Sequence, residues 1–121
     1  MPELFDVIEL IIDIPERQLR AGMHGTVLDC YPDGAYEVEF ANEFGETLDF
    51  WSFTTDQFIV IWRDATHTWV PIAEQAAALV ANLPDNAAHQ VLDFARFLAA
   101  RSPQAAPAQA APIYIEEPVL A

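Results

Sequence analysis

Cysteine and histidine are frequent nucleophiles, general bases and metal ligands, and this 121-residue chain has one cysteine and three histidines. They are Cys30, His24, His67 and His89. A zinc or iron site needs ligands at short, characteristic spacings, such as two histidines four residues apart or a cysteine pair, and neither spacing occurs here. The separate glycines form neither a nucleophile elbow nor a phosphate-binding loop. We therefore expect no enzyme activity, no cofactor and no metal site.

Carboxylates are the second group of side chains that could take part in chemistry or binding. Nineteen acids face five arginines, lysine is absent, and the formal net charge is −14. Such a field repels nucleic acids and anionic membranes, which both bind through lysine and arginine. It favours a basic protein partner, because opposite charges speed encounter and reject wrong partners. The alternative is that the acids only keep a small domain soluble.

Two sets of side chains are the candidates for contacting a basic partner. The first set is acidic and is expected near one face of the sheet: Asp13, Glu16, Asp29, Glu37 and Glu39. The second set is apolar or aromatic and would anchor the complex: Trp51, Phe53, Ile113, Tyr114 and Ile115. The alternatives are that the acids lie on solvated strand faces and that a helical hairpin covers the aromatic side chains.

Five short runs before residue 64 have the composition and period-two alternation of strands. They are residues 4–12, 25–31, 35–40, 47–53 and 58–62. The sequence Pro32-Asp33-Gly34 predicts a tight turn between the second and third runs, and residues 54–57 predict a single 3₁₀ turn. In the fourth run we expect Leu48 and Phe50 to face the core. Closure of five strands into a small barrel is expected, because it removes the free edges of a lone sheet.

The hydrophobic period changes from two to that of a helix after residue 64. One helix is predicted to begin at Pro71 and run to about Ala81, and a second to run from about Asp85 to about Ala100. Residues 65–101 are expected to form a helical hairpin. Residues 102–112 read as an alanine- and proline-rich linker. Residues 113–121 turn apolar again, which predicts a segment that docks on this chain or on another, with disorder as the alternative.

The first half of the chain resembles a known family. The stretches that carry the resemblance are LFDVIELIIDIPERQLRAGMHGTVLDCY, DGAYEVEF and the aspartate and glutamine of TTDQF, within residues 4–61. Their order and spacing are similar to those of a family of small uncharacterised bacterial proteins. The resemblance implies an SH3-like barrel and a role in toxin–antitoxin-type gene pairs, and it implies no catalytic residues.

Two further resemblances concern shorter stretches. LPDNAAHQVLDFARFL, residues 83–98, is similar to a helix of short antitoxin-like proteins. Those proteins usually carry an N-terminal DNA-binding element, where this chain has acidic strands, so we expect no promoter binding. The sequence pattern GxxGTV…YEVEF resembles that of KOW-type and Tudor-type barrels, which bind RNA or modified cations. The acidity argues against RNA and leaves an aromatic cage for a methylated cation as an alternative.

We thus expect an α+β fold, with a five-stranded SH3-like small β-barrel over residues 1–64, a two-helix hairpin and a Pro/Ala-rich tail. The expected function is that of a non-enzymatic module that neutralises or regulates a cognate basic protein. The alternative is an accessory module that self-associates or joins a larger complex through the hairpin and residues 113–121. The acidic residues 1–10 and the lack of an apolar run of about 20 residues predict a bacterial cytoplasmic protein.

Overall fold

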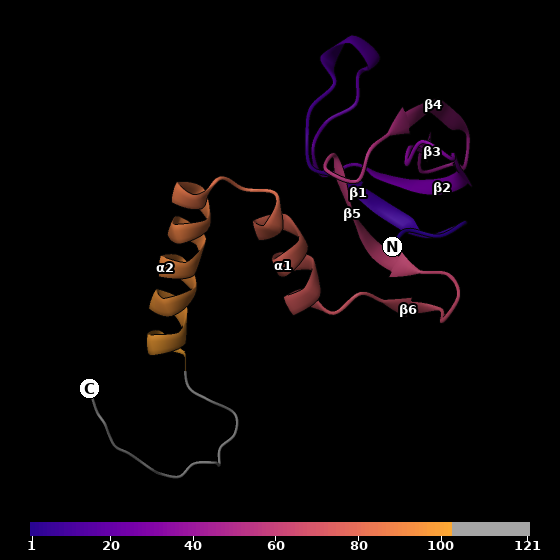
Figure 1. The fold of residues 1–121 in the computed structure, drawn as a ribbon. Coiled ribbons are helices and arrows are strands. Elements are labelled where there is room, and N and C mark those ends of the chain that lie inside the picture. The colour runs from indigo at the N-terminus through magenta and orange to yellow at the C-terminus, as the bar shows by residue number, and fades with distance from the viewer. Residues whose placement is uncertain (103–121) are drawn as a thin grey trace. The chain divides into compact units, whose positions relative to one another are not determined.

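Six strands and two α-helices follow one another along the chain in the computed structural model, which describes residues 1–102 (Figure 1). The elements are β1 (Val7–Leu10), η1 (Pro15–Arg17), β2 (His24–Cys30), β3 (Tyr36–Ala41), β4 (Thr47–Phe53), β5 (Phe58–Arg63), β6 (Thr68–Trp69), α1 (Ile72–Ala81) and α2 (Asp85–Arg101). The described residues fall into two units, residues 1–84 and the helix α2 that follows them. The predicted linker and docking segment, residues 103–121 with Ile113, Tyr114 and Ile115, lie outside the described residues.

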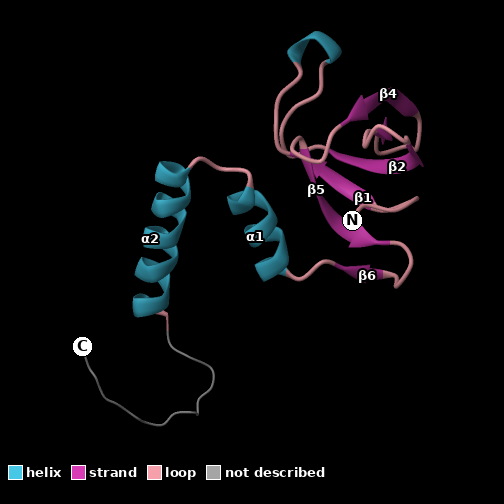
Figure 2. Cartoon of the chain, viewed as in Figure 1, coloured by secondary structure: helices cyan, strands magenta, loops and turns pink. Residues whose placement is uncertain are grey.

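All six strands form one antiparallel sheet in the order β4-β3-β2-β1-β5-β6 (Figure 2). The mixed α+β class is confirmed, whereas the prediction of a closed five-stranded barrel is wrong. The short strand β6 pairs with β5 through Trp62 opposite Trp69. Within residues 1–102, β5 does not pair with β4, so the sheet stays open and β4 forms one of its edges.

The core lies on one face of the sheet and follows the period of the strands. In β3 the buried residues Tyr36, Val38 and Phe40 alternate with partly exposed acids, as the sequence predicts. Two aromatic pairs in the core pack edge to face. They are Tyr36 with Phe58 and Phe40 with Phe53, with ring centroids 5.9 and 5.7 Å apart. Such pairs contribute roughly 0.5–1.5 kcal/mol beyond the area they bury.

The face of β4 that packs against the core is the opposite of the one predicted from the sequence. Phe53 is 1% exposed and belongs to the core, whereas Leu48 and Phe50 are 56% and 46% exposed. The pairing of β4 with β3 sets this orientation, because Phe53 lies opposite the buried Tyr36. Cys30, the last residue of β2, is exposed.

The long loop between β1 and β2 folds back on the sheet. Its turn η1 begins at Pro15, and a bridge pairs Ile14 with Leu19, whose side chain is 1% exposed in the core. Gln18 turns the chain with a left-handed φ of 58°. Anchoring by Leu19 holds the intervening residue Arg17 over β4, which places a cation beside the sheet's free edge.

The two helices agree with the predicted bounds to within about one residue. Helix α1 belongs to the same unit as the sheet and contacts β5, and the buried Val70 leads into it. Helix α2 has no buried residue, and along it Phe94 and Phe97 stack with centroids 6.1 Å apart. The predicted hairpin of the two helices stays a prediction. Within residues 1–102, no helix is long and apolar enough to cross a membrane.

Candidate partner-binding surface

A bidentate ion pair joins the long loop to β4. The Arg17 Nε donates to Asp49 Oδ2 at 2.7 Å, and Nη2 donates to Asp49 Oδ1 at 2.6 Å. The same guanidinium lies 3.7 Å from the ring centroid of Trp51. Paired, planar contacts of this kind are stronger and more specific in geometry than a single surface salt bridge. The loop is therefore held to β4 through one arginine.

The charges of this pair stabilise each other. The hydrogen bond from Arg17 holds the pKa of Asp49 below its ordinary value, although partial burial acts in the opposite direction. The same hydrogen bond raises the pKa of Arg17. A carboxyl with a lowered folded-state pKa stabilises the fold at pH above its ordinary value, and this contribution is lost as the pH falls through the lowered value. The pair is thus intact at neutral pH and weakens in acid.

The pair also occupies peptide groups at the free edge of β4. Arg17 Nη2 donates to the carbonyl oxygen of Phe50 at 3.3 Å, and the Phe50 N–H donates to Asp49 Oδ1 at 2.9 Å. Unpaired edge groups invite pairing with another chain, and natural proteins often cover them. Here two side chains cover one residue of a seven-residue edge strand.

The outer face of β3 and β4 combines acids with an exposed aromatic ring. Glu39 lies opposite Phe50 and Glu37 lies opposite Ser52 in the ladder. A hollow of about 140 Å³ opens there, lined by Glu37, Phe50, Trp51 and Ser52. Because Ser52 is small, it leaves room between the Phe50 side chain and the Glu37 carboxylate. We call Glu37, Glu39, Phe50 and Ser52, whose side chains share this face, the outer patch.

The acids of the outer patch accept hydrogen bonds from neighbouring hydroxyls. Glu37 accepts one from Tyr31, and Glu39 accepts one from Thr47. The hydrogen bond to Glu37 is the main cause that raises the pKa of Tyr31 to about 12. Each carboxylate keeps further lone pairs for other donors, since an ionised carboxyl has about four acceptor sites.

Most of these residues lie in a segment with a recognisable family signature. Residues 4–60 match the family model described as Domain of unknown function (DUF4926). No curated protein and no solved structure shows a significant match to the chain. The matched segment covers β1 to the middle of β5, with the long loop and the outer patch, and excludes β6 and both helices. The DUF4926 match supports the expected resemblance to an uncharacterised family.

The structure brings together only part of the predicted site. Glu37 and Glu39 meet in the outer patch, and Glu16 precedes Arg17 in η1. Trp51 lies opposite the buried Val38, so its side chain is on the other face of β4, beneath Arg17. The other members are placed elsewhere: Asp13 Oδ1 accepts the Ala21 N–H at 2.8 Å within the long loop, Asp29 lies exposed on β2, and Phe53 is in the core. Phe53 is therefore not accessible to a partner.

Sequence reasoning missed Arg17, Asp49 and Phe50 as parts of this surface. Arg17 and Asp49 are separated by 32 residues, so no local spacing connects them. A usable signal was the scarcity of bases. With nineteen acids and only five arginines, each arginine has many possible carboxylate partners, and Asp49 is the one charged residue of its strand.

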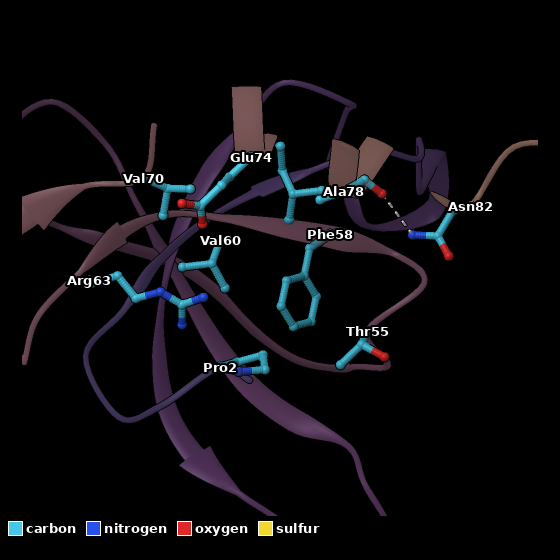
Figure 3. Close-up of a pocket in the computed structure, with 10 residues that line it drawn as sticks. Pro2, Thr55, Phe58, Val60, Arg63, Val70, Glu74, Ala78 and Asn82 are labelled. Atoms are coloured by element: carbon cyan, nitrogen blue, oxygen red, sulfur yellow. Dashed lines mark hydrogen bonds between the residues drawn. The ribbon is translucent and has the colours of Figure 1, made fainter. Parts of the chain in front are cut away.

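A second hollow, of about 270 Å³, lies between β5 and α1 (Figure 3). Its walls include Phe58 and Val60 from β5, Glu74 and Ala78 from α1, and Asn82 at the end of that helix. Glu74, Ala78 and Asn82 are four residues apart and so lie along one side of the helix and its cap. Ala78 is small and the other two are polar, so this face does not fill the space above β5.

Arg63 reaches toward this second hollow in Figure 3. Its Nη1 donates to the Met1 carbonyl oxygen at 2.9 Å and to Asp6 Oδ2 at 3.4 Å. The charge of Arg63 is thus balanced within the fold. Among residues 1–102, no three histidine, cysteine or acidic side chains gather as metal ligands would.

The Tyr31–Glu37 contact makes a prediction for alkaline titration. We expect Tyr31 to ionise with a pKa of about 12, against about 10 for a free tyrosine. The phenol is favoured in the folded state, so its contribution to stability is present below about pH 10 and is lost as the pH rises toward 12. The measurement is ultraviolet tyrosinate absorbance, compared between the wild type and Tyr31→Phe, with circular dichroism reporting the fold at each pH.

Two acid-to-amide variants control this titration. Glu37→Gln removes the charge that Tyr31 contacts and should return the Tyr31 pKa toward its ordinary value. Glu39→Gln removes an equal charge that contacts Thr47 instead, and should leave the Tyr31 titration unchanged. A Tyr31 component that titrates near pH 10 in the folded wild type would contradict the prediction.

Proposed function

We propose that this chain is a non-enzymatic binding protein that holds and neutralises a basic protein, as antitoxins and immunity proteins do. The observation that carries the proposal is the outer patch. Two acids, Glu37 and Glu39, lie on the same face as Phe50, which is 46% exposed. Trp51, also 46% exposed, lies on the other face of the same edge strand. Interfaces are typically built from aromatic anchors with charged groups around them.

The distribution of charge supports a basic partner. Arg17 is paired with Asp49, and Arg63 is paired with Asp6. Residues 1–84 contain one further arginine, Arg20, so little positive charge offsets their fifteen acids. The field of this unit therefore attracts cations and accelerates encounter with a basic protein.

We propose further that residues 7–63 are an SH3-like fold. The strands β1 to β5 follow the order β4-β3-β2-β1-β5, with a long loop after β1 and a tight turn before β5. The resemblance to a family found in toxin–antitoxin-type pairs favours the same function. A bacterial cytoplasmic setting belongs to this proposal, since such pairs act inside the cell.

Capture of the partner from a lysate of the source organism tests the proposal. The tagged chain should retain one dominant basic protein, which high salt releases because ions screen exposed charges. Glu37→Gln with Glu39→Gln should weaken retention about tenfold, since exposed ion pairs contribute up to about 1 kcal/mol each. Glu43→Gln with Glu74→Gln is the matched control: both acids are exposed, and the net charge changes equally.

The comparison of these two double variants decides the outcome. Retention that falls equally in both would mean that charge acts without a defined site. Recovery of no basic protein above background from a lysate that expresses the neighbouring genes would contradict the proposed function.

An accessory module that self-associates is the second candidate, and one observation favours it. Five large apolar side chains of α2 are between 40% and 61% exposed: Val91, Leu92, Phe94, Phe97 and Leu98. Exposed apolar rows of this kind mark interaction sites. Sedimentation of the purified chain separates the candidates, because self-assembly gives a stable homo-oligomer without another protein and the first proposal does not require one.

A further inference from the structure

We propose that the basic partner contributes an extended segment that pairs as an added strand with the free edge of β4. Its basic side chains would lie over the outer patch, beside Glu37 and Glu39. This inference rests on the proposed function and specifies how the partner binds. Main-chain hydrogen bonds would supply affinity, and the side-chain positions would supply specificity, as in other cases of strand addition.

The edge of β4 is available to a new strand. It ends the sheet and is seven residues long, whereas the other edge strand, β6, has two. The Phe50 peptide groups bind side chains of Arg17 and Asp49, so they point away from β3. By the alternation of an antiparallel ladder, Ser52, two residues further on, presents its peptide groups to the same edge.

The contact from Arg17 to the Phe50 carbonyl at this edge is weak enough for an incoming strand to replace it. The contact from Arg17 to the Phe50 carbonyl is 3.3 Å long, while the two contacts from Arg17 to Asp49 are 2.7 and 2.6 Å. An incoming N–H can therefore take the Phe50 carbonyl while Arg17 keeps its bidentate pair. The loop and Trp51 would then stay in place, and the strand would meet a preorganised edge.

The outer patch defines which side chains the added strand should carry. A residue placed beside Ser52 lies next to the hollow of about 140 Å³. A lysine or arginine there can pack its aliphatic stem against Phe50 and reach across Ser52 to the Glu37 carboxylate. A residue of the added strand placed beside Phe50 is separated from Glu39 only by Phe50, because Glu39 lies opposite Phe50 in the ladder. Alternating basic residues therefore match the spacing of the two acids.

Charge selects this occupant over a second copy of the chain. Each copy has a net charge of −14, so edge-to-edge pairing of two copies would bring like charges together. Like charges directly opposite one another on neighbouring strands are destabilising. A basic strand removes that repulsion and neutralises Glu37 and Glu39.

A synthetic strand tests the inference on the full-length chain. The probe is a blocked heptapeptide that alternates lysine and valine. Two isomers of it carry N-methyl groups on either the valine or the lysine nitrogens, so each loses hydrogen bonding along one edge while its charge is unchanged. Binding is followed by tryptophan fluorescence at low salt, and hydrogen exchange of the Ser52 amide reports pairing at the β4 edge.

Strand addition predicts that the unmodified peptide binds and that one methylated isomer binds at least tenfold more weakly than the other. It also predicts slower exchange at Ser52, and weaker binding to Glu37→Gln than to the matched control Glu43→Gln. Equal binding of both isomers would overturn strand addition and leave the proposed function standing. Absence of peptide binding would overturn strand addition, while capture of the basic partner decides the proposed function separately. Slow exchange at Ser52 in a dimer of the chain alone would assign the edge to a second copy and overturn the inference.

Discussion

Asp6→Ala is expected to lower the free energy of unfolding by about 3 kcal/mol, because it leaves buried donors without their acceptor. Asp6 is 1% exposed. Its Oδ1 accepts the Asp64 N–H at 3.0 Å, and its Oδ2 accepts the Glu3 N–H at 2.9 Å and Arg63 Nη1 at 3.4 Å. One carboxylate therefore ties the start of the chain to the end of β5.

Chemical denaturation followed by tryptophan fluorescence measures this effect. Asp6→Asn keeps the volume of the side chain and one acceptor oxygen. Its free energy of unfolding should therefore lie between those of the wild type and the alanine variant. Glu43→Ala removes an exposed acid and should change the free energy of unfolding by less than about 0.5 kcal/mol. If Asp6→Ala were no more destabilising than Glu43→Ala, the role assigned to this network would be wrong.

Gly25→Ala is expected to cost about 3 kcal/mol for a different reason, the overpacking of a full core. An added Cβ would lie 2.5 Å from Val38 Cγ1, 2.9 Å from Phe40 Cε1 and 3.0 Å from the Glu39 carbonyl oxygen. Both side chains are fully buried and the third neighbour is backbone, so none can move aside freely. The close approach of β2 to β3 therefore requires glycine at this position.

Two comparisons separate overpacking from backbone strain. Gly45→Ala introduces a side chain at a φ of 82° with open space around it, and should cost only about 1–2 kcal/mol. Val38→Ala removes the nearest clashing group, so the double variant Gly25→Ala/Val38→Ala should be less destabilised than the sum of its parts. Additive losses in the double variant would show that the Val38 contact is not the cause.

The two stability tests also help to distinguish a loss of binding from a loss of folding. Neither Asp6 nor Gly25 belongs to the outer patch, and both act through the core or the chain terminus. Variants at Glu37 and Glu39 change exposed or partly exposed acids, so they should bind less while unfolding at nearly the same denaturant concentration. A change in binding without a change in unfolding therefore identifies the outer patch.

Features that depend on neighbouring residues could be predicted from the sequence. Alternation of Tyr36, Val38 and Phe40 with acids identifies β3 and its buried face. Pro32-Asp33-Gly34 supplies the turn before it, where Gly34 adopts a φ of 90° and its N–H donates to the Tyr31 carbonyl at 3.0 Å. The helix bounds follow from the change of period and from proline near each start. Local period and backbone preference act over a few residues, so a single sequence displays them directly.

Part of the candidate site shares this local origin. Glu37 and Glu39 are two residues apart on a strand, so their common outward face follows from the pleat alone. The half-exposed position of Trp51 did not follow, because it depends on which residues of β3 the edge strand β4 meets. The burial of Phe53 has the same cause.

Tertiary structure alone decided the open edge and the ion pair beside it. A two-residue strand, Thr68–Trp69, carries too little pattern to be recognised, yet it extends the sheet beyond β5. Arg17 meets Asp49 because Leu19 anchors the long loop in the core. Contacts between residues far apart in sequence form only when the rest of the fold holds their backbones in place, and that cooperative requirement leaves no local mark on the sequence.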